Sequence, residues 1–161
     1  QPPSGDGATD YRAFQPLAAK LDPAQVDAAL QAAAADIKSV FPKGKQGIWG
    51  FCMGGKIALK QAVAHPETYS AAAIFYGAVA GTDPKAMKVP MVGNYGEKDT
   101  GIPAADVRAF ADALTVPHDI KVYPEAGHAF FDDQRASYVD SAATDAWRRT
   151  IAFLGKYLAS A

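Results

Sequence analysis

Short apolar runs alternate with helical segments from residue 47 onward, and this alternation constrains the fold more than any other feature of the sequence. The pattern is typical of a buried parallel sheet whose strands are joined by crossover helices. We expect strands at Gly47–Phe51, Ala71–Tyr76, Val89–Tyr95 and Asp119–Tyr123, with helices at Gly54–Ala64, Pro103–Leu114 and Ser137–Leu158. The fold class is therefore predicted as α/β, with about four parallel strands and flanking helices.

A clear helix start precedes this region. The run Asp22-Pro23-Ala24-Gln25 supplies an N-cap, a proline in the first turn and a glutamine at the third helical position. Pro42 and Gly44 end this helix. A shorter amphipathic segment starts at Asp10, and residues 1–9 are expected to form a loop. A chain of 161 residues is predicted to fold as a single domain over 1–161.

Charge and hydropathy exclude two classes of partner. The formal net charge of −1 provides no extended basic surface for a phosphate backbone, so no nucleic acid partner is expected. The longest apolar runs, such as Ala71–Tyr76, are much shorter than the roughly 20 residues that a membrane span needs. The N-terminus has no charged and then apolar signal pattern, and we expect a cytoplasmic protein that contacts no membrane.

The single cysteine narrows the chemistry that the chain can carry. One thiol forms no internal disulfide and no multi-thiolate metal site. The histidines, His65, His118 and His128, lack the spacing of metal ligands, so no metal is expected. Because a lone cysteine is more often a packing residue than a reactive one, the role of Cys52 depends on its neighbours.

Those neighbours favour a nucleophile. The run Gly50-Phe51-Cys52-Met53-Gly54-Gly55 lies where a predicted strand passes into a helix, and it fits the pattern glycine, any residue, nucleophile, any residue, glycine. A residue exposed on such a sharp turn adopts strained backbone angles, and glycines two positions to either side are expected because a side chain there would collide with backbone. The turn also directs the Met53 backbone N–H toward an oxyanion formed by attack of the sulfur.

Two further residues are placed to activate this thiol. His128 and Asp99 each follow a predicted strand, and the carboxyl ends of parallel strands share one edge of the sheet. His128 is the candidate general base, and Asp99 is the candidate that orients its ring. Glu97 and Asp132 are the alternative acids.

The motifs together resemble the dienelactone hydrolase (carboxymethylenebutenolidase) family of the α/β-hydrolase superfamily, from about Asp10 to the end of the chain. The motifs that carry the resemblance are Gly50-Phe51-Cys52-Met53-Gly54-Gly55, Tyr76-Gly77, Gly96-Glu97-Lys98-Asp99 and Tyr123-Pro124-Glu125-Ala126-Gly127-His128-Ala129-Phe130. It implies a three-layer α/β-hydrolase fold and hydrolysis of lactones or small esters without a cofactor. It also implies catalytic roles for Cys52, Asp99 and His128, and oxyanion or substrate contacts for Met53, Tyr76 and Phe130.

Two departures from the family pattern affect these expectations. Family enzymes acting on a carboxylate-bearing dienelactone have an arginine four residues after the histidine, where this sequence has Asp132, which would repel a carboxylate. Arg135 is the alternative cation. The family's N-terminal strands also have no counterpart in this sequence, so the Gly47–Phe51 strand is expected to expose an unpaired edge. The N-terminal loop that gives a second oxyanion donor would be absent too, which predicts a poor catalyst.

Two alternatives to a small-molecule hydrolase remain open. The first is a non-catalytic or assembly-dependent half of the fold, which pairs through its open edge as a homodimer or with a separate N-terminal half. The second is a redox role for Cys52 as an exposed thiol of low pKa.

Overall fold

The computed structural model describes residues 15–159, which divide between Pro42 and Lys43 into two compact units. The first unit contains α1 (Gln15–Ala18) and α2 (Pro23–Val40). The predicted helix start is confirmed, because the Asp22 side chain accepts the Ala24 N–H and Pro23 takes the first helical position. The loop expected at 1–9 lies outside the described residues, and a single domain over 1–161 stays a prediction.

The second unit is built on a sheet of four parallel strands in the order β1-β2-β3-β4. Its strands agree with the predicted ones to within two residues. They are β1 (Gly47–Phe51), β2 (Ala71–Phe75), β3 (Met91–Gly96) and β4 (His118–Tyr123). The third strand begins at Met91 rather than at Val89, and the intervening Pro90 has no N–H to donate to a ladder. The α/β class is confirmed.

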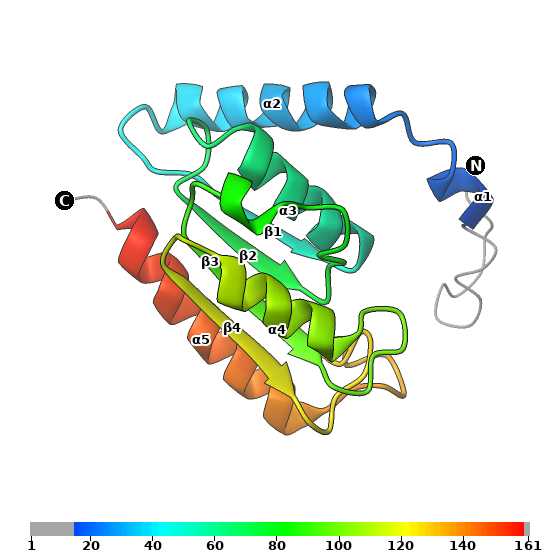
Figure 1. The fold of residues 1–161 in the computed structure, drawn as a ribbon. Helices are drawn as coiled ribbons and strands as arrows, with labels where there is room; N and C mark the ends of the chain where they lie inside the picture. Colours follow the sequence, from blue (N-terminus) through cyan, green and yellow to red (C-terminus); the bar gives the residue numbers. More distant parts are fainter. Residues whose placement is uncertain (1–14, 160–161) are drawn as a thin grey trace. The chain divides into compact units, whose positions relative to one another are not determined.

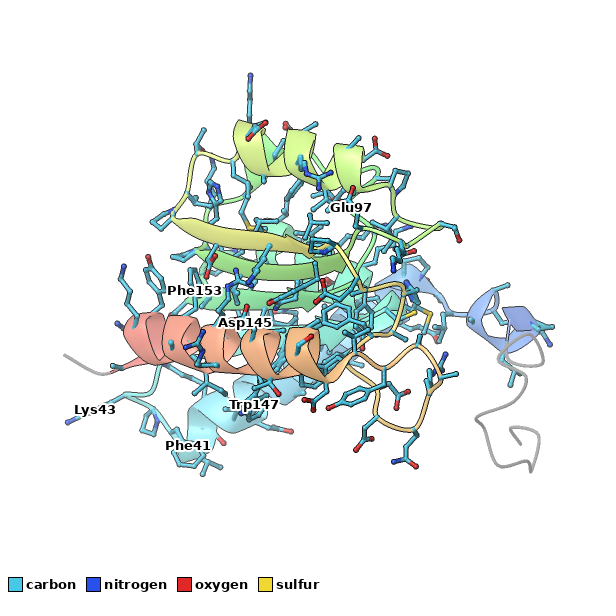
Figure 2. All side chains as sticks on the ribbon, turned by 90° about the horizontal axis from the view of Figure 1, so that it is seen from below. Phe41, Lys43, Glu97, Asp145, Trp147 and Phe153 are labelled. Atoms are coloured by element: carbon cyan, nitrogen blue, oxygen red, sulfur yellow. The ribbon has the colours of Figure 1, made fainter. Side chains whose placement is uncertain are left out.

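Helices cover both faces of this sheet. The crossovers from β1 to β2 and from β3 to β4 pass through α3 (Met53–Ala64) and α4 (Ala104–Ala113), which lie on one face (Figure 1). The last helix, α5 (Asp140–Leu158), contacts β2 and β3 from the other face, and Figure 2 shows the sheet between α4 and α5. A short 3₁₀ helix at Pro84–Ala86 lies between β2 and β3. The arrangement is a three-layer sandwich.

The two central strands form the centre of the core. Every residue of β2 and β3 is buried, whereas β1 and β4 each bury a single residue. A polar contact fixes α5 against this core, because fully buried Asn94 donates to Thr150 at 3.1 Å and accepts from Arg149 at 2.9 Å. A buried amide satisfied on both sides holds the helix in one register on the sheet.

β1 is an edge strand. Within residues 15–159, β2 is its only hydrogen-bonded neighbour. The Cys52 N–H donates to Phe75 O at 3.0 Å, so the two-residue alternation of a strand turns the N–H groups of Trp49 and Phe51 away from β2. The predicted open edge is therefore present in this part of the chain.

None of the helices in residues 15–159 combines the length and the apolar character that crossing a bilayer requires.

Candidate active site

Cys52 stands at the corner between β1 and α3. Its backbone has φ 52° and ψ −121°, a left-handed conformation that a residue with a side chain adopts only at a cost of about 1–3 kcal/mol. Two hydrogen bonds hold it there: its N–H continues the sheet ladder to Phe75, and its carbonyl accepts the Lys56 N–H in the first turn of α3. The side chain at this corner is exposed, as a nucleophile requires.

Only one of the two glycines that flank Cys52 in the motif has the steric role that the sequence predicted. A Cβ at Gly50 would lie 2.1 Å from Gly54 O, so the collision expected at that position is confirmed. At Gly54 a Cβ would meet nothing within 4 Å, and the same expectation is wrong there. The second close approach is between Gly55 and Gly77, where a Cβ on Gly77 would lie 2.4 Å from the Gly55 carbonyl carbon. This contact lets α3 approach the end of β2.

The structure brings Cys52, His128 and Asp99 together in one hydrogen-bonded line. His128 Nε2 lies 3.0 Å from Cys52 Sγ, and His128 Nδ1 lies 2.7 Å from Asp99 Oδ2. The other oxygen, Asp99 Oδ1, accepts the backbone N–H groups of Gly101 at 2.9 Å and Ile102 at 3.1 Å. The Asp99 side chain is only 2% exposed, so its carboxylate is fixed in the orientation that the imidazole needs.

The alternative acids are engaged elsewhere. Glu97 forms an exposed ion pair with Arg108 on α4. Asp132 forms an ion pair with Arg135, with Nε and Oδ2 2.9 Å apart. Neither of them takes the position beside His128 Nδ1, which Asp99 occupies.

The remaining histidines stand apart from this line. His118 Nδ1 lies 2.8 Å from Val116 O, and His65 Nδ1 lies 3.5 Å from Glu67 Oε1. Across residues 15–159, no group of three or more His, Cys, Asp or Glu side chains is arranged to hold a metal ion.

The contacts shift the pKa values of thiol and imidazole in opposite directions. The hydrogen bond from His128 lowers the pKa of Cys52 against the opposing effect of burial, and the His128 charge, the Met53 backbone N–H and the Arg135 charge lower it further. The hydrogen bond to Cys52 raises the pKa of His128 to about 9 against burial, with Asp99 adding to the rise. The two shifts favour a thiolate beside an imidazolium, the form in which a cysteine is nucleophilic.

Strained backbone gathers at this site. The non-glycine residues with positive φ in residues 15–159 are Cys52, Tyr76 at φ 38° and Ala129 at φ 60°. Tyr76 follows β2 and Ala129 follows His128, so each of them shapes a loop that borders the thiol. Such a concentration of strain is typical of functional sites.

The two aromatic residues expected to contact a substrate are both buried. The Tyr76 ring packs against His128 with centroids 5.2 Å apart, and burial raises its pKa, with the charges of Asp132 and Cys52 adding to the rise. Phe130 has no exposed surface, and its ring lies between Tyr76 and Tyr123. In this structure Phe130 supports Tyr76 and offers a substrate no accessible face.

Comparison with known proteins identifies the family. The model of the dienelactone hydrolase family matches residues 3–158. The chain belongs to this family. It is 38% identical over 131 residues to a Yersinia pestis protein named "Putative carboxymethylenebutenolidase", with 73% of this chain and 49% of that protein covered.

Solved structures extend the comparison to the fold. A crystal structure from Klebsiella pneumoniae, described as "Putative Dienelactone Hydrolase", is 34% identical with a TM-score of 0.77, over 90% of this chain and 66% of that one. An α/β hydrolase from a deep-sea metagenome is 16% identical with a TM-score of 0.57, over 70% of this chain and 54% of that one, and it supports the fold alone. The predicted partial α/β-hydrolase fold is confirmed. The chain spans about half the length of the curated relatives it matches.

The Gly55–Gly77 contact generates a stability prediction. Gly77→Ala should lower the free energy of unfolding by about 1–3 kcal/mol, because its Cβ must displace the backbone of α3. Gly54→Ala is the matched control: its Cβ enters open space in the first turn of α3, where alanine favours the helix, so the free energy of unfolding should stay the same or rise by up to about 1 kcal/mol. Urea denaturation followed by circular dichroism measures both variants. Equal losses in both would contradict the assigned contact.

The shifted pKa values generate a prediction about thiol reactivity. The thiolate forms above the lowered pKa of Cys52, and the imidazolium persists up to about pH 9, so the ion pair occupies the window between these values. The rate of alkylation by iodoacetamide should therefore inflect at a lower pH in the native chain than in His128→Ala, where the thiol loses its hydrogen-bond donor. The same alkylation in denaturant, where both proteins should behave alike, is the control. An inflection at one common pH in the folded proteins would refute the pairing.

Proposed function

We propose that this chain carries the catalytic residues of a hydrolase that cleaves small esters or lactones through a thioester on Cys52. The observation that carries the proposal is the line from Cys52 Sγ through His128 to the buried Asp99. A thiol, an imidazole and a carboxylate in this order are the components of nucleophilic acyl transfer. Membership of the dienelactone hydrolase family supports the same reaction class, and the chemistry needs no cofactor.

The first half of the reaction acylates the sulfur. The Cys52 thiolate attacks the carbonyl carbon, and the carbonyl π electrons move onto the oxygen. We assign the Met53 N–H, at the positive end of α3, as the hydrogen-bond donor to that oxyanion. The intermediate then collapses: the carbon–oxygen bond breaks, the leaving alkoxide takes the proton from His128 Nε2, and a thioester remains.

The second half releases the acid. His128 Nε2, now unprotonated, takes a proton from water as the water oxygen attacks the thioester carbonyl. Collapse of the second intermediate expels the thiolate and restores its pair with the imidazolium. Asp99 accepts the hydrogen bond from Nδ1–H throughout, so that Nε2 always faces the sulfur.

This mechanism predicts that Cys52→Ala reduces the hydrolysis of p-nitrophenyl acetate to the uncatalysed background. No other thiol in the chain can replace the nucleophile. The measurement is release of p-nitrophenolate, together with mass spectrometry of the protein quenched in acid, which should detect an acetyl group on the native chain alone.

Thr144→Ala is the control, because this exposed residue on α5 takes no part in the hydrogen-bonded line. It should leave the rate unchanged. Hydrolysis that survives in Cys52→Ala at the native rate would overturn the proposal.

A second candidate function is an assembly-dependent half of the fold. The open edge of β1 supports it, together with an aromatic cluster beside that edge, where Trp49 packs against Phe51, Phe75 and Trp147. Phe51 is 41% and Trp147 50% exposed. Strand groups that have no partner within residues 15–159, next to exposed aromatic rings, favour pairing with a second copy or with a separate N-terminal half.

Pairing with a second copy predicts that the purified chain is dimeric in light scattering after size exclusion. Trp147→Ser should shift it toward monomer, because the substitution removes apolar surface from the cluster. Arg148→Ser, at a neighbouring position that is 79% exposed, is the control and should leave the mass unchanged. A native chain that is folded and strictly monomeric would contradict pairing with a second copy.

A further inference from the structure

The loop that carries His128 also carries a pair of opposite charges. Asp132 is held by the loop itself, since its N–H donates to Ala129 O at 3.0 Å and its Oδ1 accepts the Gln134 N–H at 3.1 Å. Its other oxygen accepts from Arg135 Nε at 2.9 Å, and the Arg135 N–H returns to the Asp132 carbonyl at 3.1 Å. The side chains are 39% and 40% exposed, so the pair faces solvent while its geometry is fixed.

Both charges act on the groups around the thiol. Besides the hydrogen bond from His128, the positive charge of Arg135 lowers the pKa of Cys52. Besides burial, the negative charge of Asp132 raises the pKa of Tyr76, whose ring packs on His128, and Arg135 opposes that rise. The positive charge of Arg135 therefore acts on the sulfur, and the negative charge of Asp132 acts on the tyrosine that packs against His128.

We propose that Asp132 and Arg135 set the charge of the accepted substrate, and that this substrate is a neutral ester or lactone rather than a carboxylate-bearing one. This inference rests on the proposed function. Arg135 is the cation of the loop nearest in sequence to His128, but Asp132 already takes one edge of its guanidinium. A substrate carboxylate would have to compete with a carboxylate that the loop backbone holds in place. An uncharged acyl group meets no such competition.

The electrostatic part is tested on the thiol itself, independently of hydrolysis. Iodoacetamide and iodoacetate alkylate the same sulfur, one as a neutral reagent and the other as an anion. The ratio of the iodoacetate rate to the iodoacetamide rate removes changes in thiolate fraction, because these affect both reagents equally. Asp132→Asn should raise this ratio about threefold at low ionic strength and Arg135→Gln should lower it about threefold, and added salt should reduce both effects.

Asp112→Asn changes the same charge at an exposed position on α4 and should leave the ratio unchanged.

The preference for a neutral substrate is tested by comparing the hydrolysis of 4-acetoxybenzoate with that of its methyl ester. The native chain should prefer the methyl ester, and Asp132→Asn should shift the kcat/KM ratio about threefold toward the anion.

Alkylation ratios that are the same in the native chain, Asp132→Asn and Arg135→Gln would overturn the inference, and so would a native preference for the anionic ester. If instead the proposed function is wrong, the result differs. Cys52→Ala would hydrolyse both esters at the native rate, while the alkylation ratios would still respond to the two charge variants.

Discussion

The backbone at Cys52 is the constraint on which the site depends. The residue belongs at once to a sheet and to a helix, since its N–H donates to Phe75 at the end of β2 and its carbonyl starts the hydrogen bonding of α3. Both demands are met only with a positive φ, and this angle lifts the thiol out of the sheet. Because α3 must also pass within contact distance of the residue after Tyr76, the corner tolerates no side chain at Gly55 or Gly77. Strain at one residue is thus held by two rigid elements.

Much of this arrangement was predictable because it depends on chain order. The four strands, the helix start at Asp22 and the placing of Asp99 and His128 after successive strands follow from local patterns, and a parallel sheet gathers such loops at one edge. What escaped prediction depends on distances across the fold. Gly54 looked essential from its position in the motif, yet its Cβ would enter open space, whereas the contact at Gly77 involves residues 22 positions apart. The only trace of that contact in the sequence was the glycine following Tyr76.

The aromatic residues illustrate the same limit. A resemblance can assign Phe130 to the site, but it cannot tell a residue that touches a substrate from one that supports a neighbour. In the structure its ring fills the space between Tyr76 and Tyr123, and Tyr123 in turn accepts a hydrogen bond from Arg149, which also bonds Asn94 in the core. Packing therefore connects the imidazole, through Tyr76, to the polar contacts that fix α5. The His128 ring is therefore fixed both by packing against the Tyr76 ring and by the hydrogen bond between Nδ1 and the Asp99 carboxylate.

The opposite pKa shifts of Cys52 and His128 affect which step of the proposed reaction is difficult. Because the hydrogen bond from His128 lowers the pKa of Cys52, less free energy is needed to ionise the sulfur before attack, and stabilising the oxyanion becomes the larger demand. The Met53 N–H is one donor for that purpose, yet in the resting state it lowers the pKa of the same sulfur. As negative charge moves from the sulfur to the carbonyl oxygen, the hydrogen bond from this N–H can shift from the sulfur to the new oxyanion with little rearrangement. It is the one donor that we assign within residues 15–159, and removing a single oxyanion donor typically costs about 10²–10³ in rate. Within residues 15–159, β1 has no hydrogen-bonded neighbour on its outer side, so a segment that pairs there would lie next to the corner that carries Cys52 and Met53.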